Sequence, residues 1–279
     1  MQINLSGGRT LSTSRSSFVM GILNATPDSF FSGSRKPELQ EGLDTAGAMI
    51  DDGADIIDIG GESTRPGSSY IEVDEEIRRV VPLIEGIRKF SDAAISIDTR
   101  KAAVAEAAIN AGADIVNDVS GLRDDARLGF IVSQYDVPVV LMHMRGTPEN
   151  MQKNPHYTDV VQEIIDELEI GVCRAKSMTV AADKIIIDPG IGFGKRLEDN
   201  LLILKHIQRF RDLGYPVLIG LSRKSFIGDV TGADIDSRLA GSIAANMYSV
   251  MNGAEILRVH DVKETVWMLD IISAIEGAD

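Results

Sequence analysis

The stretch AAISIDTRKAAVAEAAINAGADIVNDVS (93–120) holds two short apolar runs on either side of an alanine-rich segment. The runs AAISIDT (93–99) and DIVNDVS (114–120) predict strands buried on both faces, because Ile and Val dominate their apolar positions. The segment between them predicts a helix over 102–111, which Gly112 would end in a left-handed conformation. A strand, a helix and a second strand in this order form one βα unit of a parallel sheet.

The same alternation continues along the whole chain. Six further runs complete a set of eight predicted strands: FVMGILN (18–24), ADIIDIGG (54–61), PVVLMHM (138–144), IIIDPG (185–190), PVLIGLS (216–222) and ILRVHD (256–261). Apolar residues at helical spacing lie between them, in 45–52, 73–90, 159–177 and 236–255. Eight βα units favour an α/β fold of the (β/α)8 TIM-barrel type, as a single domain over 1–279 with about residues 1–17 as an N-terminal extension. A doubly wound open sheet stays the alternative, because sequence does not reveal strand order.

The composition argues against several classes of protein. The chain has 279 residues, 44% of them hydrophobic, and a formal charge of −14. An acidic chain is not expected to bind nucleic acid, which requires a basic face. No apolar run approaches the length of a membrane span, the N-terminus lacks a secretory signal, and Cys173 stands alone. We therefore expect a soluble cytoplasmic protein with no nucleic-acid or membrane partner, and Cys173 as a packed or half-exposed helical thiol.

Polar side chains stand at the end of nearly every predicted strand. They are Asn24, Glu62 with Ser63, Thr64 and Arg65, Asp98, Asn117, His143, Asp188, Ser222 with Lys224, and Arg258 with His260. Active sites of α/β barrels lie at the C-terminal ends of the strands, so the set as a whole predicts one site. For Asp98 alone, which precedes TRKAAVAEA, a helix cap is an equally good explanation.

The types of these residues indicate the shape of a ligand. Asp98, Asn117 and Asp188 are short side chains with few rotamers, and they suit a flat heterocycle that presents amino and lactam N–H groups in one plane. Lys224 is placed to donate to the opposite edge of such a ring. Lys224, Arg258 and His260 also predict a phosphate or pyrophosphate site, because barrels commonly bind phosphate after strands seven and eight. Arg223 is better explained as a solvated or ion-paired surface residue.

Two other features carry weaker signals. The segment DPGIGFGKR (188–196) lacks the spacing of a nucleotide-binding loop, and its glycines instead predict a tight turn that brings Phe193 near a ligand. The four histidines lack zinc-site spacing, so His143 is best explained as a buried histidine with satisfied hydrogen bonds.

Eight motifs together resemble the dihydropteroate synthase family. They are MGILNATPDSF (20–30), GGESTRPG (60–67), SIDT (96–99), NDVSG (117–121), LMHMRGTP (141–148), DPGIGFGK (188–195), LSRKSFIG (221–228) and RVHDVKE (258–264). The resemblance runs from about residue 18 to 275 and implies a TIM barrel. It also implies condensation of 6-hydroxymethyl-7,8-dihydropterin pyrophosphate with 4-aminobenzoate, which releases pyrophosphate and gives dihydropteroate for folate synthesis. The family is the sulfonamide target and usually forms homodimers.

The resemblance further implies roles for single residues. Asp98, Asn117 and Asp188 match the family's pterin-holding positions, with Met142 along the pocket wall and Lys224 at the opposite edge. Their short polar side chains agree with the planar ligand inferred from the residues alone.

The remaining motif positions match the other substrate and the metal. Arg258 and His260 match the pyrophosphate side, where the family uses Mg²⁺ with Asn24 as its protein contact; a lone amide ligand suits an ion that keeps several waters. Thr64, Arg65 and Pro66 match the family's second mobile loop. The aminobenzoate pocket of the family is matched by Ser225, Lys224 and Phe193.

The mechanism implied by the resemblance begins with departure of pyrophosphate. Mg²⁺, Arg258 and His260 would stabilise the charge that develops on the leaving group, and the arylamine would then attack the cationic pterin methylene. The expected catalytic residues are Asn24, Asp98, Lys224, Arg258 and His260. Two alternatives stay open: a pterin-dependent methyltransferase, which has no need of the cations in SRKSF and RVHD, and a catalytically idle paralogue that binds a pterin or a partner protein.

The stretch NATPDSFFSGS (24–34) follows the first predicted strand and carries turn residues with two adjacent phenylalanines. The residues alone allow a plain turn or a loop that closes over a substrate. The resemblance favours a mobile lid, with Phe30 as an apolar wall against the aminobenzoate. Many family members carry aspartate at the position of Ser32, so we expect Ser32→Asp to leave the activity intact or to raise it.

Overall fold

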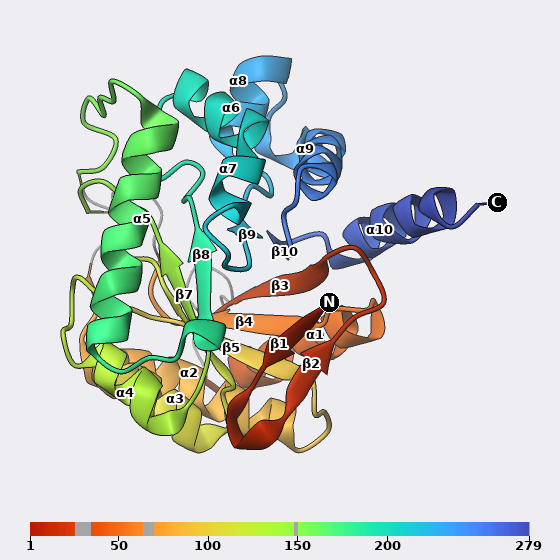
Figure 1. The fold of residues 1–279 in the computed structure, drawn as a ribbon. Helices are drawn as coiled ribbons and strands as arrows, with labels where there is room; N and C mark the ends of the chain where they lie inside the picture. The colour runs from red at the N-terminus through yellow and green to blue at the C-terminus, as the bar shows by residue number, and fades with distance from the viewer. Residues whose placement is uncertain (26–34, 64–67, 69, 148–149, 279) are drawn as a thin grey trace.

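The computed structural model describes residues 1–25, 35–63, 68, 70–147 and 150–278 of the chain. Parallel strands form the centre of the molecule (Figure 1). They are β3 (Phe18–Asn24), β4 (Ile56–Gly60), β5 (Ala94–Asp98), β6 (Ile115–Asp118), β7 (Val139–Met142), β8 (Ile185–Asp188), β9 (Leu218–Ile219) and β10 (Ile256–Val259). Each lies within one of the eight predicted runs.

The strand order decides between the two predicted architectures. Neighbours in the sheet are neighbours in the chain from β3 to β8, and β10 joins β3 to β9. The ring closes between β8 and β9, where Ile187 forms a parallel bridge with Val217 and its N–H donates to the Pro216 carbonyl oxygen at 2.9 Å. A doubly wound sheet reverses its strand order and leaves two open edges. The chain is therefore an α/β barrel of the TIM type, and the open-sheet alternative is wrong.

Helices separate the strands and cover the outside of the ring. They are α1 (Arg35–Asp51), α2 (Val73–Arg88), α3 (Ala102–Ala111), α4 (Leu128–Tyr135), α5 (Val160–Ser177), α6 (Leu197–Lys205), α7 (Ile207–Arg211), α8 (Ser225–Thr231), α9 (Leu239–Met251) and α10 (Val262–Glu276), with short 3₁₀ turns at Ser6–Gly8, Ala182–Lys184 and Ile235–Ser237. Gly53 and Gly112 follow α1 and α3 with φ of 95° and 116°, which confirms the predicted glycine stops. Among the described residues, no helix is both long and apolar enough to cross a bilayer.

Alternate residues of each strand point to opposite faces, so the barrel has an inner and an outer core. The inner core lies at the N-terminal ends of the strands and comprises Phe18, Met20, Ile56, Ala94, Ile115, Val140, Ile186, Leu218 and Ile256. Outward residues such as Ile57, Ile95 and Val116 pack against the helices. Further along the strands, the inward positions become polar, and this change positions the site at the opposite end of the barrel.

The N-terminal extension packs against the barrel and forms a separate small sheet. β1 (Gln2–Asn4) and β2 (Thr10–Ser12) form an antiparallel hairpin that sequence analysis did not predict, because three-residue runs are too short to show a period. Ile3 and Leu5 are 5% and 3% exposed and belong to the inner core. Buried Lys184 donates to the carbonyl oxygens of Leu5 at 3.0 Å and Asp136 at 2.9 Å. The hairpin thus covers the N-terminal end of the barrel.

Candidate active site

Arg258 lies at the centre of a polar layer inside the barrel. Its Nε donates to Asp58 Oδ2 at 2.6 Å and its Nη2 donates to Asp98 Oδ2 at 2.7 Å. Asn117, the register partner of Asp98, donates from Nδ2 to the same oxygen of Asp58 at 3.1 Å. Strands β4, β5, β6 and β10 therefore bring two acids, one amide and one cation to one level.

This layer holds two carboxylates around one guanidinium. Burial raises the pKa of Asp98 to about 7; the charge of Arg258 opposes this rise, and the nearby Asp58 carboxylate adds to it. Burial by itself would lower the pKa of Arg258, but the two carboxylates raise it overall. The cation therefore stays charged while Asp98 is poised to exchange a proton near neutral pH.

The structure decides against Asp98 as a helix cap. Helix α3 begins three residues after Thr99, and the N–H of its first residue, Ala102, donates to Asp125 Oδ2 at 3.0 Å. Asp98 instead accepts from Arg258 and is 6% exposed. Its side chain belongs to the site and not to the helix terminus.

Asp188 on β8 and Met142 on β7 are register partners, and only β9 lies between β8 and β10, the strand of Arg258. Asp188 Oδ1 accepts from the Gly190 N–H at 2.7 Å, which fixes the carboxylate plane. Burial raises the pKa of Asp188, and the charge of Lys224 opposes the rise. Met142 is 5% exposed and packs in an apolar cluster with Val119, Met144, Met151 and Phe193. The layer thus combines buried acids with an apolar wall.

Lys224 stands at the mouth of the barrel, directly before α8. Its Nζ donates to the Ile191 carbonyl oxygen and lies 4.6 Å from the centre of the Phe193 ring. Burial lowers the pKa of Lys224 to about 8, while Asp188 acts in the opposite direction. The lysine therefore bridges the loop after β8 and the loop after β9.

The glycines of DPGIGFGKR form the predicted tight turn. Gly190 and Gly194 have φ of 70° and 63°. A Cβ at Gly190 would lie 1.9 Å from the His143 carbonyl oxygen, a distance that no side chain tolerates. The glycines allow the loop to pass this close to the end of β7, and Phe193 is half-buried beside the apolar wall.

Three predicted residues lie at the rim. Asn24 is half-buried at the end of β3, opposite Gly60 in the register, and Ser225 is exposed at the start of α8. His260 is exposed just beyond β10, with its N–H and its Nδ1 each 3.2 Å from Ser222 Oγ. Arg223 donates from Nε to Asp261 at 3.0 Å, which confirms its interpretation as an ion-paired residue.

Several predicted residues fall outside the described part of the chain. They are Phe30, Ser32, Thr64, Arg65 and Pro66. Cys173 is exposed on α5, so the prediction of a packed or half-exposed thiol is wrong. His143 is 4% exposed and contacts Glu167 and Lys195, which confirms its interpretation as a satisfied buried histidine.

The family model for pterin binding enzymes matches residues 20–260. The chain belongs to this family. A dihydropteroate synthase of Bacillus subtilis is 44% identical over 265 residues, 95% of this chain and 90% of that protein. The enzyme of the same name from Escherichia coli strain K12 is 42% identical over 260 residues, 93% of this chain and 92% of that protein.

Solved structures agree over the full length. A Xanthomonas albilineans dihydropteroate synthase with 4-aminobenzoic acid matches with a TM-score of 0.92 at 42% identity, over 100% of this chain and 99% of that one. The Yersinia pestis enzyme with a sulfonamide drug complex matches with a TM-score of 0.92 at 40% identity, over 100% of both chains. The barrel is thus the fold of the pterin-binding synthases.

Sequence analysis missed one residue in the centre of this pterin-family site. Asp58 is 0% exposed and accepts from both Arg258 and Asn117. A signal for it exists in ADIIDIGG, where an acid interrupts an apolar strand at a position that faces the same side as Gly60. An acid inside a buried strand requires partners, and these come from other strands.

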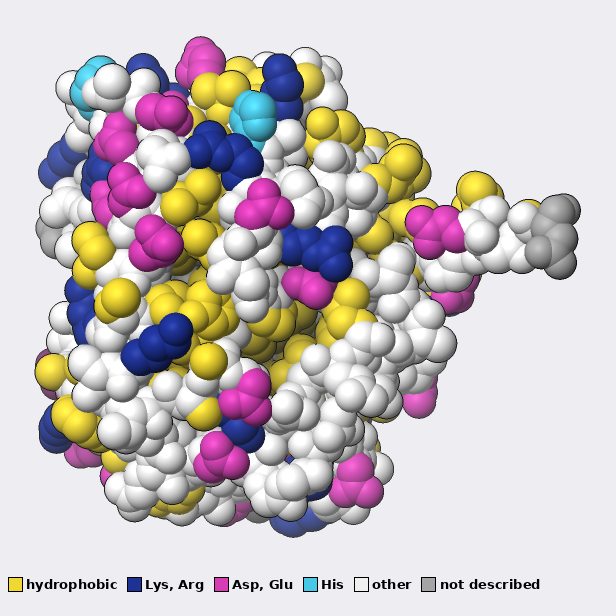
Figure 2. All heavy atoms as spheres, viewed as in Figure 1, with side chains coloured by type: hydrophobic (Ala, Val, Ile, Leu, Met, Phe, Trp, Pro, Cys, Tyr) yellow, Lys and Arg dark blue, Asp and Glu magenta, His cyan; other side chains and the backbone are white. Residues whose placement is uncertain are grey.

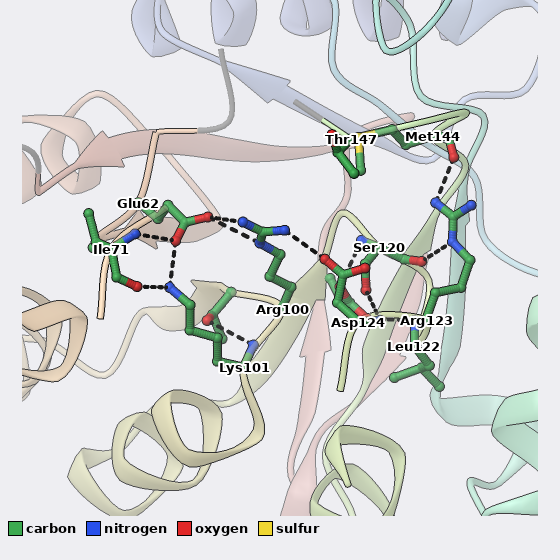
Figure 3. Close-up of polar contacts among 12 residues, drawn as sticks. Glu62, Ile71, Arg100, Lys101, Ser120, Leu122, Arg123, Asp124, Met144 and Thr147 are labelled. Carbon is green, nitrogen blue, oxygen red and sulfur yellow. Dashed lines mark hydrogen bonds and ion pairs between the residues drawn. The ribbon is translucent and has the colours of Figure 1, made fainter. Parts of the chain in front are cut away.

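An ionic network joins the loops at the rim of the barrel (Figure 3). Glu62, after β4, accepts from Arg100 Nη2 at 2.7 Å and from Lys101 Nζ at 2.5 Å. Lys101 also donates to Glu76 at 2.5 Å and to the Ile71 carbonyl oxygen at 2.8 Å. Burial alone would raise the pKa of Glu62, but the hydrogen bonds from the two cations lower it overall. Lys101 thereby holds residues 62 and 71, on both sides of the predicted second loop.

The network continues to the next two loops. Arg100 Nη1 donates to Asp124 Oδ2 at 2.7 Å, and Arg123, beside Asp124, donates to the carbonyl oxygens of Ser120 at 2.7 Å and Met144 at 2.6 Å. Figure 3 shows these side chains in one row from Glu62 to Met144. The loops after β4, β5, β6 and β7 are therefore held together by charge and hydrogen bonds.

A cavity of about 220 Å³ lies on the outer side of β7, between that strand and α5. Leu141, Glu167 and Arg174 are among its lining residues, together with Met142 and His143. Leu141 belongs to the outer core, whereas Met142 belongs to the apolar wall of the site, so the cavity borders that wall.

Proposed function

We propose that this chain is an active dihydropteroate synthase, which joins the methylene carbon of 6-hydroxymethyl-7,8-dihydropterin pyrophosphate to the amine of 4-aminobenzoate. The observation that carries the proposal is the bridge from Arg258 to Asp58 and Asp98 at the level of Asn117. It places hydrogen-bonding groups for a planar ring next to a permanent cation. The relatives named dihydropteroate synthase, at 42% to 44% identity, support it independently.

The pterin would bind flat inside the polar layer. Asp98, Asn117 and Asp188 are all at least 94% buried, so hydrogen bonds to them would be formed away from water. Ionised carboxylates accept N–H groups from a pteridine edge, and Met142 supplies an apolar face. The half-buried Lys224 side chain would donate to the other edge of the ring. Pterin binding thus uses residues from four strands.

Departure of pyrophosphate would depend on the cations of β10. Arg258 is held by two carboxylates and cannot turn away, so its charge is already in place when negative charge develops on the leaving oxygen. His260 lies two residues beyond on the exposed rim. The neutral arylamine nitrogen can then attack the methylene carbon without a strong base, and the released proton passes to solvent or to the leaving group.

Mg²⁺ is proposed as the cofactor. The donors near the end of β3 fit a weakly held ion: Asn24 offers one half-buried amide oxygen, and the described residues include no cluster of three His, Cys, Asp or Glu suited to a metal. Such a site suits Mg²⁺ held by one protein ligand, waters and substrate phosphate oxygens. When bound, Mg²⁺ would supply further positive charge at the pyrophosphate. The expected cytoplasmic location and the absence of nucleic-acid and membrane partners stay predictions.

A homodimer is also proposed, through an apolar surface that we call the α9–α10 face. Its residues are Met247, Tyr248, Met251, Trp267, Ile271 and Ile275, between 42% and 71% exposed. In Figure 2, apolar side chains gather over α9 and along α10, which projects from the barrel. Soluble monomers rarely expose an apolar patch of this extent, and pairing of two such faces about a two-fold axis would bury it.

One assay tests the function. The purified protein is supplied with both substrates, with and without Mg²⁺, and dihydropteroate and pyrophosphate are measured. We expect both products in equal amounts, a requirement for Mg²⁺, and a loss of turnover in Arg258→Ala and Asp188→Ala. Calorimetric binding of the pterin without product would identify an idle paralogue, and near-normal turnover in both variants would contradict the assigned roles.

A further inference from the structure

Lys195 is a buried lysine directly beneath the apolar wall of the site. It is 3% exposed, and its Nζ lies 2.9 Å from His143 Nδ1, 3.0 Å from the Phe193 carbonyl oxygen and 3.4 Å from the His143 carbonyl oxygen. The charged form of Lys195 has three N–H groups for these three acceptors, and burial lowers the pKa of Lys195 to about 7. Two of the acceptors belong to the loop after β7 and one to the loop after β8. Lys195 therefore joins two neighbouring loops of the catalytic end.

The partners of Lys195 are themselves held in place. His143 Nε2 lies 3.1 Å from Glu167 Oε2, and Glu167 is ion-paired with Arg145. Burial, and then the charge of Lys195, lower the pKa of His143 to about 4, so the ring is neutral. A neutral ring that accepts at Nδ1 donates from Nε2 to Glu167. The chain from Lys195 to Arg145 thus has one consistent set of donors and acceptors.

The two loops also touch through their backbones. A Cβ at Gly190 would lie 1.9 Å from the His143 carbonyl oxygen, and a Cβ at Gly194 would lie 2.5 Å from the Arg145 carbonyl oxygen. The Tyr157 hydroxyl donates to the Gly194 carbonyl oxygen at 2.9 Å. The close backbone contacts at Gly190 and Gly194 set the distance between the two loops. The hydrogen bonds of Lys195 fix how the two loops are oriented relative to each other.

The residue fixed by this arrangement is Phe193. Its carbonyl oxygen accepts from Lys195, its ring lies 4.6 Å from the Nζ of Lys224, and it packs with Met142. A shift of the loop after β8 would therefore move the Phe193 ring and the partner of Lys224 together. Small displacements of groups that orient a substrate cost about 100-fold in rate for 1 Å.

We propose that Lys195 is a positioning residue for the aminobenzoate half of the reaction, which acts by holding Phe193 and, through it, Lys224. The proposal rests on the proposed synthase function. The three acceptors of the Lys195 ammonium group belong to His143 and Phe193, so the lysine acts through the two loops that carry them. Its role is distinct from that of Arg258, which belongs to the pterin and pyrophosphate half.

Lys184 offers a matched control. It is 6% exposed and, like Lys195, donates to two backbone carbonyl oxygens, but it lies at the N-terminal end of the barrel beneath the β1–β2 hairpin. Lys195→Met and Lys184→Met each remove a buried ammonium and leave carbonyl oxygens without that donor. Both variants are expected to lower the melting temperature.

The two variants should differ in their kinetics. We expect Lys195→Met to raise the KM for 4-aminobenzoate about 10- to 100-fold and to change the KM for the pterin pyrophosphate less than about 3-fold. Lys184→Met should leave both KM values at the wild-type level. Lys195→Gln keeps two N–H donors, so it should recover part of the loss and provides a second variant if Lys195→Met does not fold.

The outcome is decisive in either direction. Two results would overturn the positioning role and leave a purely structural one. The first is an unchanged KM for 4-aminobenzoate in a folded Lys195 variant. The second is an equal change in the KM values for 4-aminobenzoate and for the pterin pyrophosphate. The wild-type protein in the same assay tests the synthase function separately. If the wild type forms no dihydropteroate, the positioning role is tested by binding. Calorimetry then measures the affinity of 4-aminobenzoate for the wild type and for Lys195→Gln, in the presence of pyrophosphate and 6-hydroxymethylpterin. Equal affinities of the two proteins would reject the positioning role of Lys195.

Discussion

Arg258 and Asp58 are 200 positions apart in the chain, and the Nε of the first donates to Oδ2 of the second at 2.6 Å. Asn117 donates to the same oxygen. One buried carboxylate therefore orients two groups that are proposed to contact the pterin pyrophosphate. Because Asp58 is completely buried, its charge is compensated by these donors and not by water.

Replacement of the Asp58 carboxylate should reduce activity by more than the loss of folded protein accounts for. Asp58→Asn keeps the shape but removes the charge, so we expect kcat/KM for the pterin substrate to fall about 10- to 100-fold. Asp55→Asn is the control: Asp55 lies just before the same strand, and it accepts from the Val19 N–H at 2.8 Å, away from the polar layer. Steady-state kinetics of both variants, at matched folded fraction, provide the test. Equal activity in the two would mean that Asp58 does not orient the site.

The raised pKa of Asp98 predicts a specific dependence of stability on pH. The carboxyl has a pKa of about 7 in the folded protein because of burial, against about 3.9 in an unfolded chain. From about pH 4 to 7 the folded state therefore holds a proton that the unfolded state lacks. The stability from this group is complete below pH 4 and is lost as the pH rises to 7. Asp98→Asn should flatten that slope in urea unfolding measured from pH 5 to 8, and an unchanged slope would assign it to other groups.

Lys101 is expected to be important for stability. Its side chain is 7% exposed, and its removal leaves Glu62 and Glu76 buried without their common cation. Lys101→Met should therefore lower the free energy of unfolding by about 3–5 kcal/mol. Arg78→Met removes an exposed ion pair with Glu75 and should change stability by less than about 1 kcal/mol.

A double variant separates the two contributions of Lys101. Without Lys101, Glu62 keeps its ion pair with Arg100, whereas Glu76 loses its cation. Glu76→Gln combined with Lys101→Met removes that unpaired charge, so the double variant should be more stable than Lys101→Met alone. Denaturant unfolding monitored by circular dichroism measures all four proteins. A Lys101→Met protein as stable as Arg78→Met would show that the network at the rim contributes little.

The α9–α10 face predicts the oligomeric state. Ile271→Glu with Ile275→Glu places two charges on the most exposed part of the face and should convert a dimer into a monomer, as measured by light scattering after gel filtration. Phe130→Glu, at a residue that is 57% exposed on α4, should leave the dimer intact. A wild-type protein with the mass of one chain would contradict the proposal.

Much of the fold follows from local sequence. The eight apolar runs, the helical segments between them and the glycine stops at Gly53 and Gly112 all depend on neighbours within a few residues, and the structure confirms each. The sequence also predicted that polar residues at strand ends would gather at one end of the barrel, because the C-terminal ends of parallel strands lie together there. These residues include Asp98, Asn117, Asp188 and Lys224.

Other features were decided only when the ring closed. The bridge between Ile187 and Val217 and the pairing of β10 with β3 bring Arg258 to Asp58, and no local pattern encodes which acid a cation will meet across a barrel. The same holds for Lys195, whose three acceptors belong to two loops, and for the hairpin that covers the inner core. Local patterns depend on the short-range geometry of strands and helices, whereas the partners of a buried charge depend on strand register around the barrel. The sequence therefore indicated the polar groups at the strand ends, Asp58 excepted, and tertiary structure alone decided which of them hold one another in place.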